Sequence, residues 1–158
     1  MSVDADTFRA VFGSWTTGVT IVTSRHEERV QGMTVSAFSE VSLDPPLVLV
    51  CADKSTITNE LIEGSGVFSV SVLAEDQEAL SNRFASKKYE HERFVGLDCA
   101  EGRTGCPRIP GAIAWIDCRV SQSIDAGDHW IYVGRIEDAE ATDRAPLLYC
   151  RGRYHKLS

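Results

Sequence analysis

Short runs of β-branched and other apolar residues recur along most of the chain, with turn residues between them. Residues 19–23 form one such run, 25–29 a polar turn and 30–38 a second run, which together predict a β-hairpin. Residues 47–51 are apolar without interruption and follow Asp44-Pro45-Pro46, a pattern typical of a strand in the interior of a sheet. The chain is therefore expected to build a sheet from short, closely connected strands.

The remaining segments complete an α+β, mainly β pattern. Apolar spacing predicts helices over 4–17, from Ser55-Thr56 to Gly64, and over 75–85. Glycine and proline punctuate residues 86–111, which predicts a long irregular segment. Further strands are expected at 67–72, 112–123, 129–136 and 146–150. About six or seven strands with hairpin connections favour an antiparallel barrel with short peripheral helices over a doubly wound parallel sheet.

Length and charge limit the possible functions. The 158 residues leave room for one domain, expected over residues 1–158. The net charge of −7 argues against a protein that binds nucleic acid or an anionic membrane through its charge. No apolar run approaches the roughly 20 residues that cross a bilayer, and residues 1–6 lack the features of a signal peptide, so a cytoplasmic location is expected.

Several chemistry-bearing motifs are missing from the sequence. The five cysteines are scattered without a C-x-x-C pair, which predicts free thiols and no metal site. Residues 64–66 begin like a dinucleotide fingerprint, but the third glycine is missing and a strand follows where a helix is needed. P-loop, zinc-protease and serine-hydrolase motifs do not occur.

Two segments carry residues suited to a ligand. In residues 32–48, small side chains would let a flat ligand approach the backbone, and Thr34, Ser36 and Ser39 offer hydroxyl groups; a strand with a polar outer face explains the same pattern. At the predicted start of the second helix, Lys54 and Ser55-Thr56 suit a phosphate, although an ordinary capped helix would look the same. Both interpretations stay open at this point.

Five features of the chain resemble the flavin reductase family, the FMN-binding split barrels that serve as reductase components of two-component flavin monooxygenases. These features occur in the family's order and cover nearly the whole chain: Phe8-Arg9 with Thr17–Thr23, Gly32-Met33-Thr34 with Ser42–Leu47, Arg83-Phe84-Ala85, Gly127-Asp128-His129, and Gly152-Arg153-Tyr154-His155. The resemblance implies a split β-barrel.

The resemblance also assigns candidate site residues. The strand along the flavin ring corresponds to Thr34, Val35, Ser36, Ala37 and Phe38, where many members have Asn in place of Ser36. The segment near the ribityl phosphate corresponds to residues 51–57, with Lys54, Ser55, Thr56 and Ile57 as the implied contacts, and a second contact region corresponds to Arg83 and Phe84. His129 is the implied catalytic residue beside the nicotinamide, and Tyr154 is a further implied contact on that side.

The function implied by the resemblance is an NAD(P)H:flavin oxidoreductase. It would pass a hydride from NADH or NADPH to FMN or FAD and supply the reduced flavin to a separate monooxygenase, as a homodimer with the flavin near the subunit interface. An FMN-binding oxidase and a redox-sensing flavoprotein on the same fold are the alternatives. Gly127-Asp128-His129 argues against a sensor without turnover.

Overall fold

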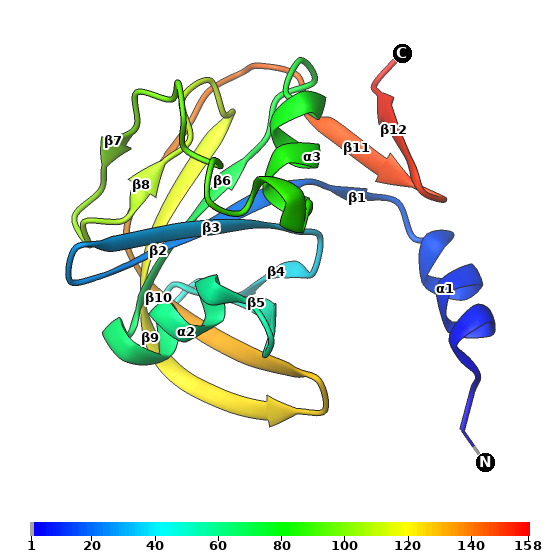
Figure 1. Ribbon diagram of the computed structural model, residues 1–158, viewed down its shortest axis with the longest axis horizontal. Helices are drawn as coiled ribbons and strands as arrows, with labels where there is room; N and C mark the ends of the chain where they lie inside the picture. Colours follow the sequence, from blue (N-terminus) through cyan, green and yellow to red (C-terminus); the bar gives the residue numbers. More distant parts are fainter. Residues whose placement is uncertain (1) are drawn as a thin grey trace.

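The computed structural model describes residues 2–158, which form a mainly β protein with three α-helices (Figure 1). The helices are α1 (Ala5–Gly13), α2 (Ile57–Ser65) and α3 (Glu78–Ala85), and a 3-10 turn, η1 (Lys87–Tyr89), follows α3. The longer strands are β2 (Thr20–His26), β3 (Arg29–Val35), β4 (Phe38–Ser42), β5 (Leu47–Asp53), β6 (Val67–Val72), β9 (Ala114–Ala126) and β10 (His129–Ala141). The shorter ones are β1 (Thr17–Gly18), β7 (Ala100–Glu101), β8 (Pro107–Arg108), β11 (Leu147–Cys150) and β12 (Arg153–Lys156).

Seven strands form one antiparallel sheet in the order β3-β2-β6-β9-β10-β5-β4. The predicted hairpin is confirmed as β2 and β3, and the apolar run of β5 lies between β10 and β4, in the sheet interior as expected. The outermost strands, β3 and β4, follow one another in the chain and are joined only by Ser36 and Ala37. The chain therefore passes from one edge strand of the sheet to the other through this two-residue link.

The apolar core lies in two clusters on either side of β2. Val50, Phe68 and Tyr132 are fully or almost fully buried in the cluster beneath α2. Ile21 and Phe84 belong to the second cluster, beneath α3. Burial of these large side chains supplies most of the stabilising hydrophobic free energy, at about 25 cal/mol per Å² of apolar surface removed from water.

Local sequence signals place α2 correctly. Thr56 is its N-cap and accepts a hydrogen bond from the Asn59 amide at 3.1 Å. Gly66 ends the helix in the left-handed conformation with φ of 71°, which glycine adopts without a steric cost. The helix lies over β2 and β3 and begins directly at the end of β5.

The N-terminal and C-terminal segments differ from the sequence-based expectation. The first helix ends at Gly13, because Thr17 and Gly18 pair with β11 instead of continuing it. The third helix begins at Glu78, since the Glu75 amide donates to the Ala145 carbonyl. The sequence pattern also missed β12, which pairs with β11 to form a three-stranded sheet with β1.

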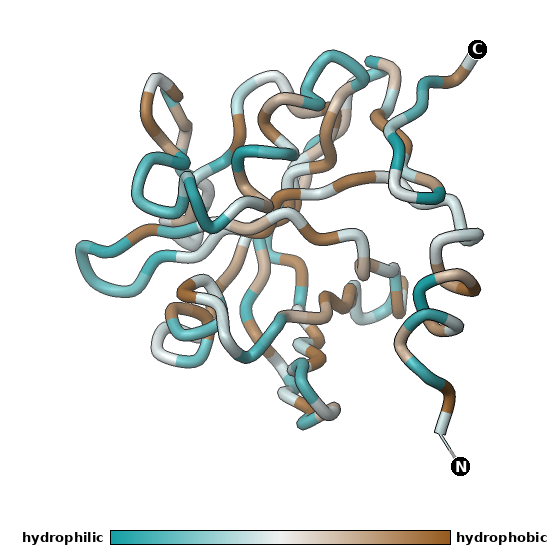
Figure 2. Tube along the Cα trace, turned by 45° about the vertical axis from the view of Figure 1, so that its right-hand side comes forward, coloured by the Kyte–Doolittle hydropathy of each residue, from teal (hydrophilic) through white to brown (hydrophobic). Residues whose placement is uncertain are grey.

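The apolar face of α1 does not reach the core. Phe8, Val11 and Phe12 are each more than half exposed, and Trp15 is 72% exposed. Figure 1 shows α1 beside the C-terminal strands, away from the large sheet, and Figure 2 shows brown apolar stretches along it. An amphipathic helix whose apolar face is exposed to water is unusual in a monomeric protein.

The segment 86–111 is held to the sheet by a buried carboxylate. Asp117 is fully buried on β9 and accepts hydrogen bonds from the Arg103 amide at 2.8 Å and from Arg108 Nη2 at 3.2 Å. Gly102 approaches this carboxylate so closely that a Cβ there would lie 1.5 Å from Asp117 Oδ2.

None of the helices in the described residues has the length and apolar character needed to cross a bilayer.

Candidate functional site

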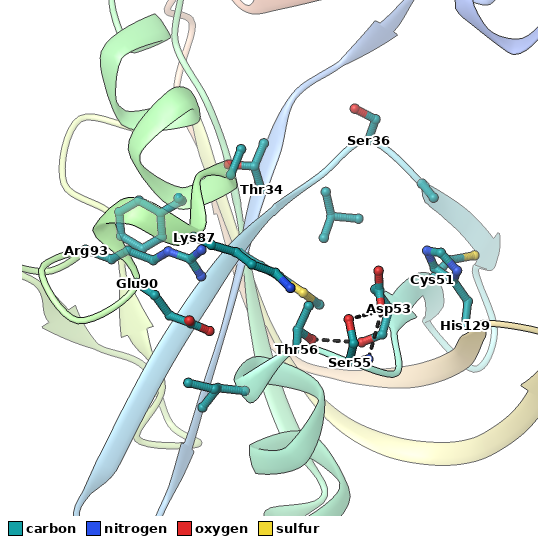
Figure 3. A pocket seen from close by; sticks show the side chains of 16 residues that line it. Thr34, Ser36, Cys51, Asp53, Ser55, Thr56, Lys87, Glu90, Arg93 and His129 are labelled. Carbon is teal, nitrogen blue, oxygen red and sulfur yellow. Dashed lines mark hydrogen bonds between the residues drawn. The ribbon is translucent and has the colours of Figure 1, made fainter. Parts of the chain in front are cut away.

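A cavity of about 640 Å³ opens where the free edge of β3 faces the start of α2. Four further parts of the chain complete its wall: the end of β5, the end of α3, the segment from η1 to Arg93, and the first residue of β10. Figure 3 shows the cavity-lining side chains converging from these elements. The lining residues are Met33, Thr34, Val35, Ser36, Ala37, Cys51, Asp53, Ser55, Thr56, Ile57, Phe84, Ala85, Lys87, Glu90, Arg93 and His129.

The edge of β3 provides a flat wall of backbone and small side chains. β3 pairs with β2 on one side alone, so the backbone groups along its other edge are free of sheet hydrogen bonds. The Thr34 hydroxyl donates to the Ser81 carbonyl at 2.6 Å, which ties β3 to α3. Ser36 and Ala37 continue this edge as exposed small residues, so a planar ligand can approach the backbone here.

The opposite wall is the junction of β5 and α2. One carboxylate oxygen of Asp53 accepts hydrogen bonds from the Ser55 amide at 2.8 Å and from the Ser55 hydroxyl at 2.7 Å. The Thr56 hydroxyl donates to the Asp53 carbonyl at 2.8 Å. These bonds hold the turn before α2 in shape, and Ser55, Thr56 and Ile57 line the cavity at the positive end of the helix dipole.

Electrostatics at this wall keep Asp53 ionised. The hydrogen bonds from Ser55 are the main reason that the pKa of the Asp53 carboxyl is lowered, and electrostatic interactions with His129 and Lys87 lower it further. The site thus presents a carboxylate beside groups that favour anions.

His129 enters the site at the start of β10. The tight turn before it uses Gly127 with φ of 69°, in the region that favours glycine. His129 is paired with Asp53 across the β5–β10 ladder, and its Nδ1 lies 2.7 Å from a carboxylate oxygen of Asp128. Asp128 therefore orients the imidazole, while the ring itself lines the cavity.

Nine of the predicted site residues line this one cavity. They come from three segments far apart in the sequence and the end of α3: Thr34, Val35, Ser36, Ala37, Ser55, Thr56, Ile57, Phe84 and His129. The Phe84 ring is fully buried and packs edge-on against Phe94 with ring centroids 5.2 Å apart. It supports the cavity wall from within the core.

Four predicted residues lie outside the cavity wall, and two of them are basic. The Lys54 amine pairs with Asp125 and lies 5.2 Å from the centroid of the Trp130 ring. Arg83 donates from Nη1 to the backbone carbonyls of Arg93 at 3.2 Å and Val95 at 2.9 Å, so it holds the loop after α3 and does not line the cavity.

The other two, Phe38 and Tyr154, lie around neighbouring hollows. Phe38 packs against the core and borders a second cavity of about 660 Å³, which shares Ser36, Ala37 and Cys51 with the first. The Tyr154 hydroxyl lies 2.6 Å from Ser81 Oγ, beside a smaller cavity of about 320 Å³ that also includes Thr34 and Ser36.

Sequence reasoning missed the charged residues that follow α3. Lys87 was recognisable as part of a basic pair, but nothing in the sequence pattern pointed to Glu90 or Arg93. Arg93 is only 5% exposed, and burial lowers the pKa of its guanidinium, an effect partly offset by the Glu90 charge. Met33 and Ala85 were also not predicted as site residues, and Cys51 and Asp53 lie in the predicted segment 51–57 but were not named as contacts.

The names of several known proteins that are similar to this chain describe the same activity. The family described as "Flavin reductase like domain" matches residues 12–158. The reductase subunit HsaB of a flavin-dependent monooxygenase from Mycobacterium tuberculosis is 41% identical over 155 residues, which cover 96% of this chain and 82% of that protein. An NADH-dependent flavin reductase from a Rhodococcus species is 40% identical over 154 residues, covering 94% and 84% of the two chains.

Solved structures agree with the sequence comparison. The NADH:FAD oxidoreductase SgcE6 of Streptomyces globisporus, in complex with NAD and FAD fragments, matches with a TM-score of 0.91 at 34% identity. The match covers 100% of this chain and 97% of that one. Together with the match over residues 12–158, this confirms the resemblance found in the sequence: the chain belongs to the flavin reductase family.

Proposed function

We propose that this protein is an NAD(P)H:flavin oxidoreductase that reduces FMN or FAD and releases the reduced flavin to a separate monooxygenase. The observation that carries the proposal is the convergence of the β3 edge, the α2 N-terminus and His129 on one cavity. The β3 edge suits the flavin ring, the α2 N-terminus suits the flavin phosphate, and His129 suits the nicotinamide of the hydride donor.

The residues present fit a flavin. The cavity volume of about 640 Å³ lies within the range of about 300–1,000 Å³ that is usual for small-molecule sites. Unpaired backbone groups along β3 can meet the hydrogen-bonding edge of the ring, and Ser36 and Ala37 leave its face unobstructed. Ser55, Thr56 and Ile57 line the cavity at the start of α2, where the helix dipole favours a phosphate.

The flavin ring supplies the chemistry, since it accepts a hydride from the nicotinamide ring without a covalent bond to the protein. This chain therefore has to hold two flat rings in contact, at about 3–3.5 Å between reacting atoms, and to exclude water. His129, oriented by Asp128, would contact the nicotinamide, and the β3 edge would hold the flavin.

The arrangement of the sheet suggests how the barrel is divided. We propose that the seven-stranded sheet curls into a split barrel whose opening lies between β3 and β4, at the Ser36-Ala37 link.

We further propose a homodimer in which a second copy covers the exposed face of α1 and the neighbouring cavity lined by Phe12, Trp15, Phe38 and Leu49. The flavin site would then border the subunit interface, because the two cavities share Ser36, Ala37 and Cys51.

The proposed partner protein is a flavin-dependent monooxygenase. Support comes from the name of HsaB, which is the reductase subunit of such an enzyme. We propose a cytoplasmic location. We also propose NADH or NADPH as the hydride donor. Support for NADH comes from SgcE6, which is named as an NADH:FAD oxidoreductase.

The test is consumption of NADH by the purified protein without oxygen, in parallel samples with excess FMN, excess FAD or no flavin. Loss of NADH absorbance with bleaching of many equivalents of flavin supports the proposal, and the preferred flavin is obtained from the same samples. NADPH in place of NADH gives the preferred donor. Binding of flavin without turnover would contradict the reductase function, and turnover confined to one retained FMN, restored by oxygen, would indicate an oxidase.

A further inference from the structure

A buried hydrogen bond joins the first turn of α2 to β10. The Tyr132 hydroxyl donates to Asn59 Oδ1 at 2.5 Å, and the two residues are only 2% and 4% exposed. Burial, together with the Glu63 charge, raises the pKa of Tyr132 to about 12, so its hydroxyl remains a donor at neutral pH. Removal of either partner would leave the polar atom of the other buried without this bond.

Asn59 is also bonded to the turn that precedes α2. Its backbone amide donates to the N-cap hydroxyl of Thr56 at 3.1 Å, and its side-chain Nδ2 lies 3.5 Å from the Lys54 carbonyl oxygen. The backbone amide of Lys54 donates in turn to the Asp128 carbonyl at 3.1 Å, in the tight turn that places His129. Asn59 therefore belongs to a chain of contacts that runs from the start of α2 to the start of β10.

The Tyr132–Asn59 bond connects two parts of the sheet that both reach the cavity. α2 packs over β2 and β3, and the free edge of β3 is the proposed wall for the flavin ring. β10 is separated from β2 by β6 and β9, and its first residue, His129, lies on the proposed nicotinamide side. The bond therefore fixes the helix that covers β3 against the strand that begins with His129.

The two bonded residues lie behind the cavity wall. Asn59 and Tyr132 are not among the residues that line the cavity, so their effect on a ligand passes through the walls that they hold. A hydride passes from nicotinamide C4 to flavin N5 with both electrons of the broken C–H bond, so NADH becomes NAD⁺ and the flavin becomes its anionic reduced form. The reacting atoms must lie about 3–3.5 Å apart, and a displacement of about 1 Å can slow such a step about 100-fold.

We propose that Asn59 is a positioning residue for hydride transfer. Held by the Tyr132 hydroxyl, it keeps the start of α2 in a fixed position relative to β10, so that the flavin and nicotinamide rings meet at the reacting distance. The inference rests on the proposed function and assigns a role in it to two buried residues outside the cavity. Its consequence is that loss of the bond slows the transfer without releasing either ligand.

The experiment measures hydride transfer in single turnovers, by rapid mixing of NADH with the protein and saturating FMN or FAD in the absence of oxygen. Tyr132→Phe removes the hydroxyl and keeps the ring in the core. It should slow the transfer by about 5- to 50-fold, while the NADH and flavin concentrations that give half of the maximal rate change by less than about twofold. In steady state, deuterium at the transferred position of NADH should lower kcat more in this variant than in the natural protein, because transfer becomes the slow step.

A double-mutant cycle tests whether the bond itself is responsible. Asn59→Ala should slow the transfer to a similar extent as Tyr132→Phe. The double variant should be little slower than Asn59→Ala alone, because both changes remove the same hydrogen bond. Losses that simply multiply would show that the two residues act independently, which would overturn the inference.

Ser24→Ala is the matched control for a lost buried hydroxyl. Ser24 is fully buried near the other end of α2, where its hydroxyl donates to the Val67 carbonyl at 2.8 Å and lies 3.3 Å from Ser65 Oγ. Like Tyr132→Phe, this variant should lower the midpoint of urea unfolding. Unlike Tyr132→Phe, it should leave the transfer rate within about twofold of that of the natural protein.

Two results with Tyr132→Phe would contradict the positioning role: an unchanged transfer rate, or weaker binding of FMN or NADH with an unchanged maximal rate. Circular dichroism and equilibrium flavin binding establish that each variant is folded, and if Asn59→Ala does not fold, Tyr132→Phe decides the outcome. Neither result affects the proposed function as long as the natural protein reduces flavin with NADH. A natural protein that transfers no hydride to FMN or FAD would instead remove the proposed function itself.

Discussion

His129 lies directly opposite Asp53 across the β5–β10 ladder, and both side chains line the same cavity. The pair brings together the turn before α2 and the turn before β10. Residues 53 and 129 are 76 positions apart in the chain. One residue therefore belongs to the proposed phosphate side of the site, and the other to the proposed nicotinamide side.

Replacement of His129 should affect use of the nicotinamide nucleotide more than flavin binding. We expect His129→Ala to lower kcat/KM for NADH by about tenfold, the effect of one lost hydrogen bond at the site, with flavin affinity changed less than about twofold. His91→Ala is the matched control, since His91 is exposed and does not line the cavity. Steady-state kinetics at saturating flavin provide the measurement; unchanged NADH kinetics would remove His129 from the proposed role.

Asp53 should contribute stability that depends on pH. Its pKa is lowered in the folded protein, mainly by the Ser55 hydrogen bonds, so the contribution is complete above the unfolded value of about 3.9 and is lost as the pH falls through the lowered pKa. Because Asp53 is exposed, we expect less than about 1 kcal/mol.

Urea unfolding of the natural protein and of Asp53→Asn between about pH 3 and pH 6 measures this contribution. The difference in unfolding free energy should shrink toward the acid end. Asp143→Asn, which also removes one exposed carboxylate, controls for overall charge. A difference that grows with acidity would be the opposite of the expected sign.

Gly134 should tolerate no side chain. A Cβ at this position of β10 would lie 2.5 Å from Phe68 Cζ and 2.8 Å from the Cβ of Cys118, both in the core. We expect Gly134→Ala to lower the free energy of unfolding by about 1–3 kcal/mol through overpacking. Gly13→Ala should cost little, because the nearest atom to its new methyl group would be Arg151 Cα at 3.8 Å. Denaturant midpoints compare the two; equal midpoints would show that the core can shift to accommodate the methyl group.

The exposed face of α1 should determine the proposed dimer. We expect Phe12→Asp to weaken self-association by at least about tenfold, because a charge would replace an apolar side chain in the covered face. Arg9→Glu changes a charge elsewhere on the same helix and should leave association nearly unchanged. Sedimentation of the three proteins across a concentration series measures this, and a monomer at all concentrations for the unaltered protein would contradict the dimer.

Features that depend on neighbouring residues could be predicted from the sequence. Thr56 begins α2 through a hydrogen bond within the helix, and Gly66 ends it through its backbone angle. The apolar run of β5 requires neighbouring elements on both sides wherever the strand lies. The family motifs also identified most of the cavity wall, because Thr34–Ala37 and Ser55–Ile57 each act as a continuous segment.

The partners of the long charged side chains depend on contacts between distant parts of the chain. Lys54 and Arg83 were predicted as site residues and Arg93 was not, but the β9–β10 hairpin places Asp125 and Trp130 beside Lys54 and draws it away from the cavity. Arg93 becomes a cavity residue because β3 brings the Gly32 carbonyl to it across 61 positions of the chain. Flexible side chains take the partners that long-range strand pairing brings near them, and no local pattern encodes that choice.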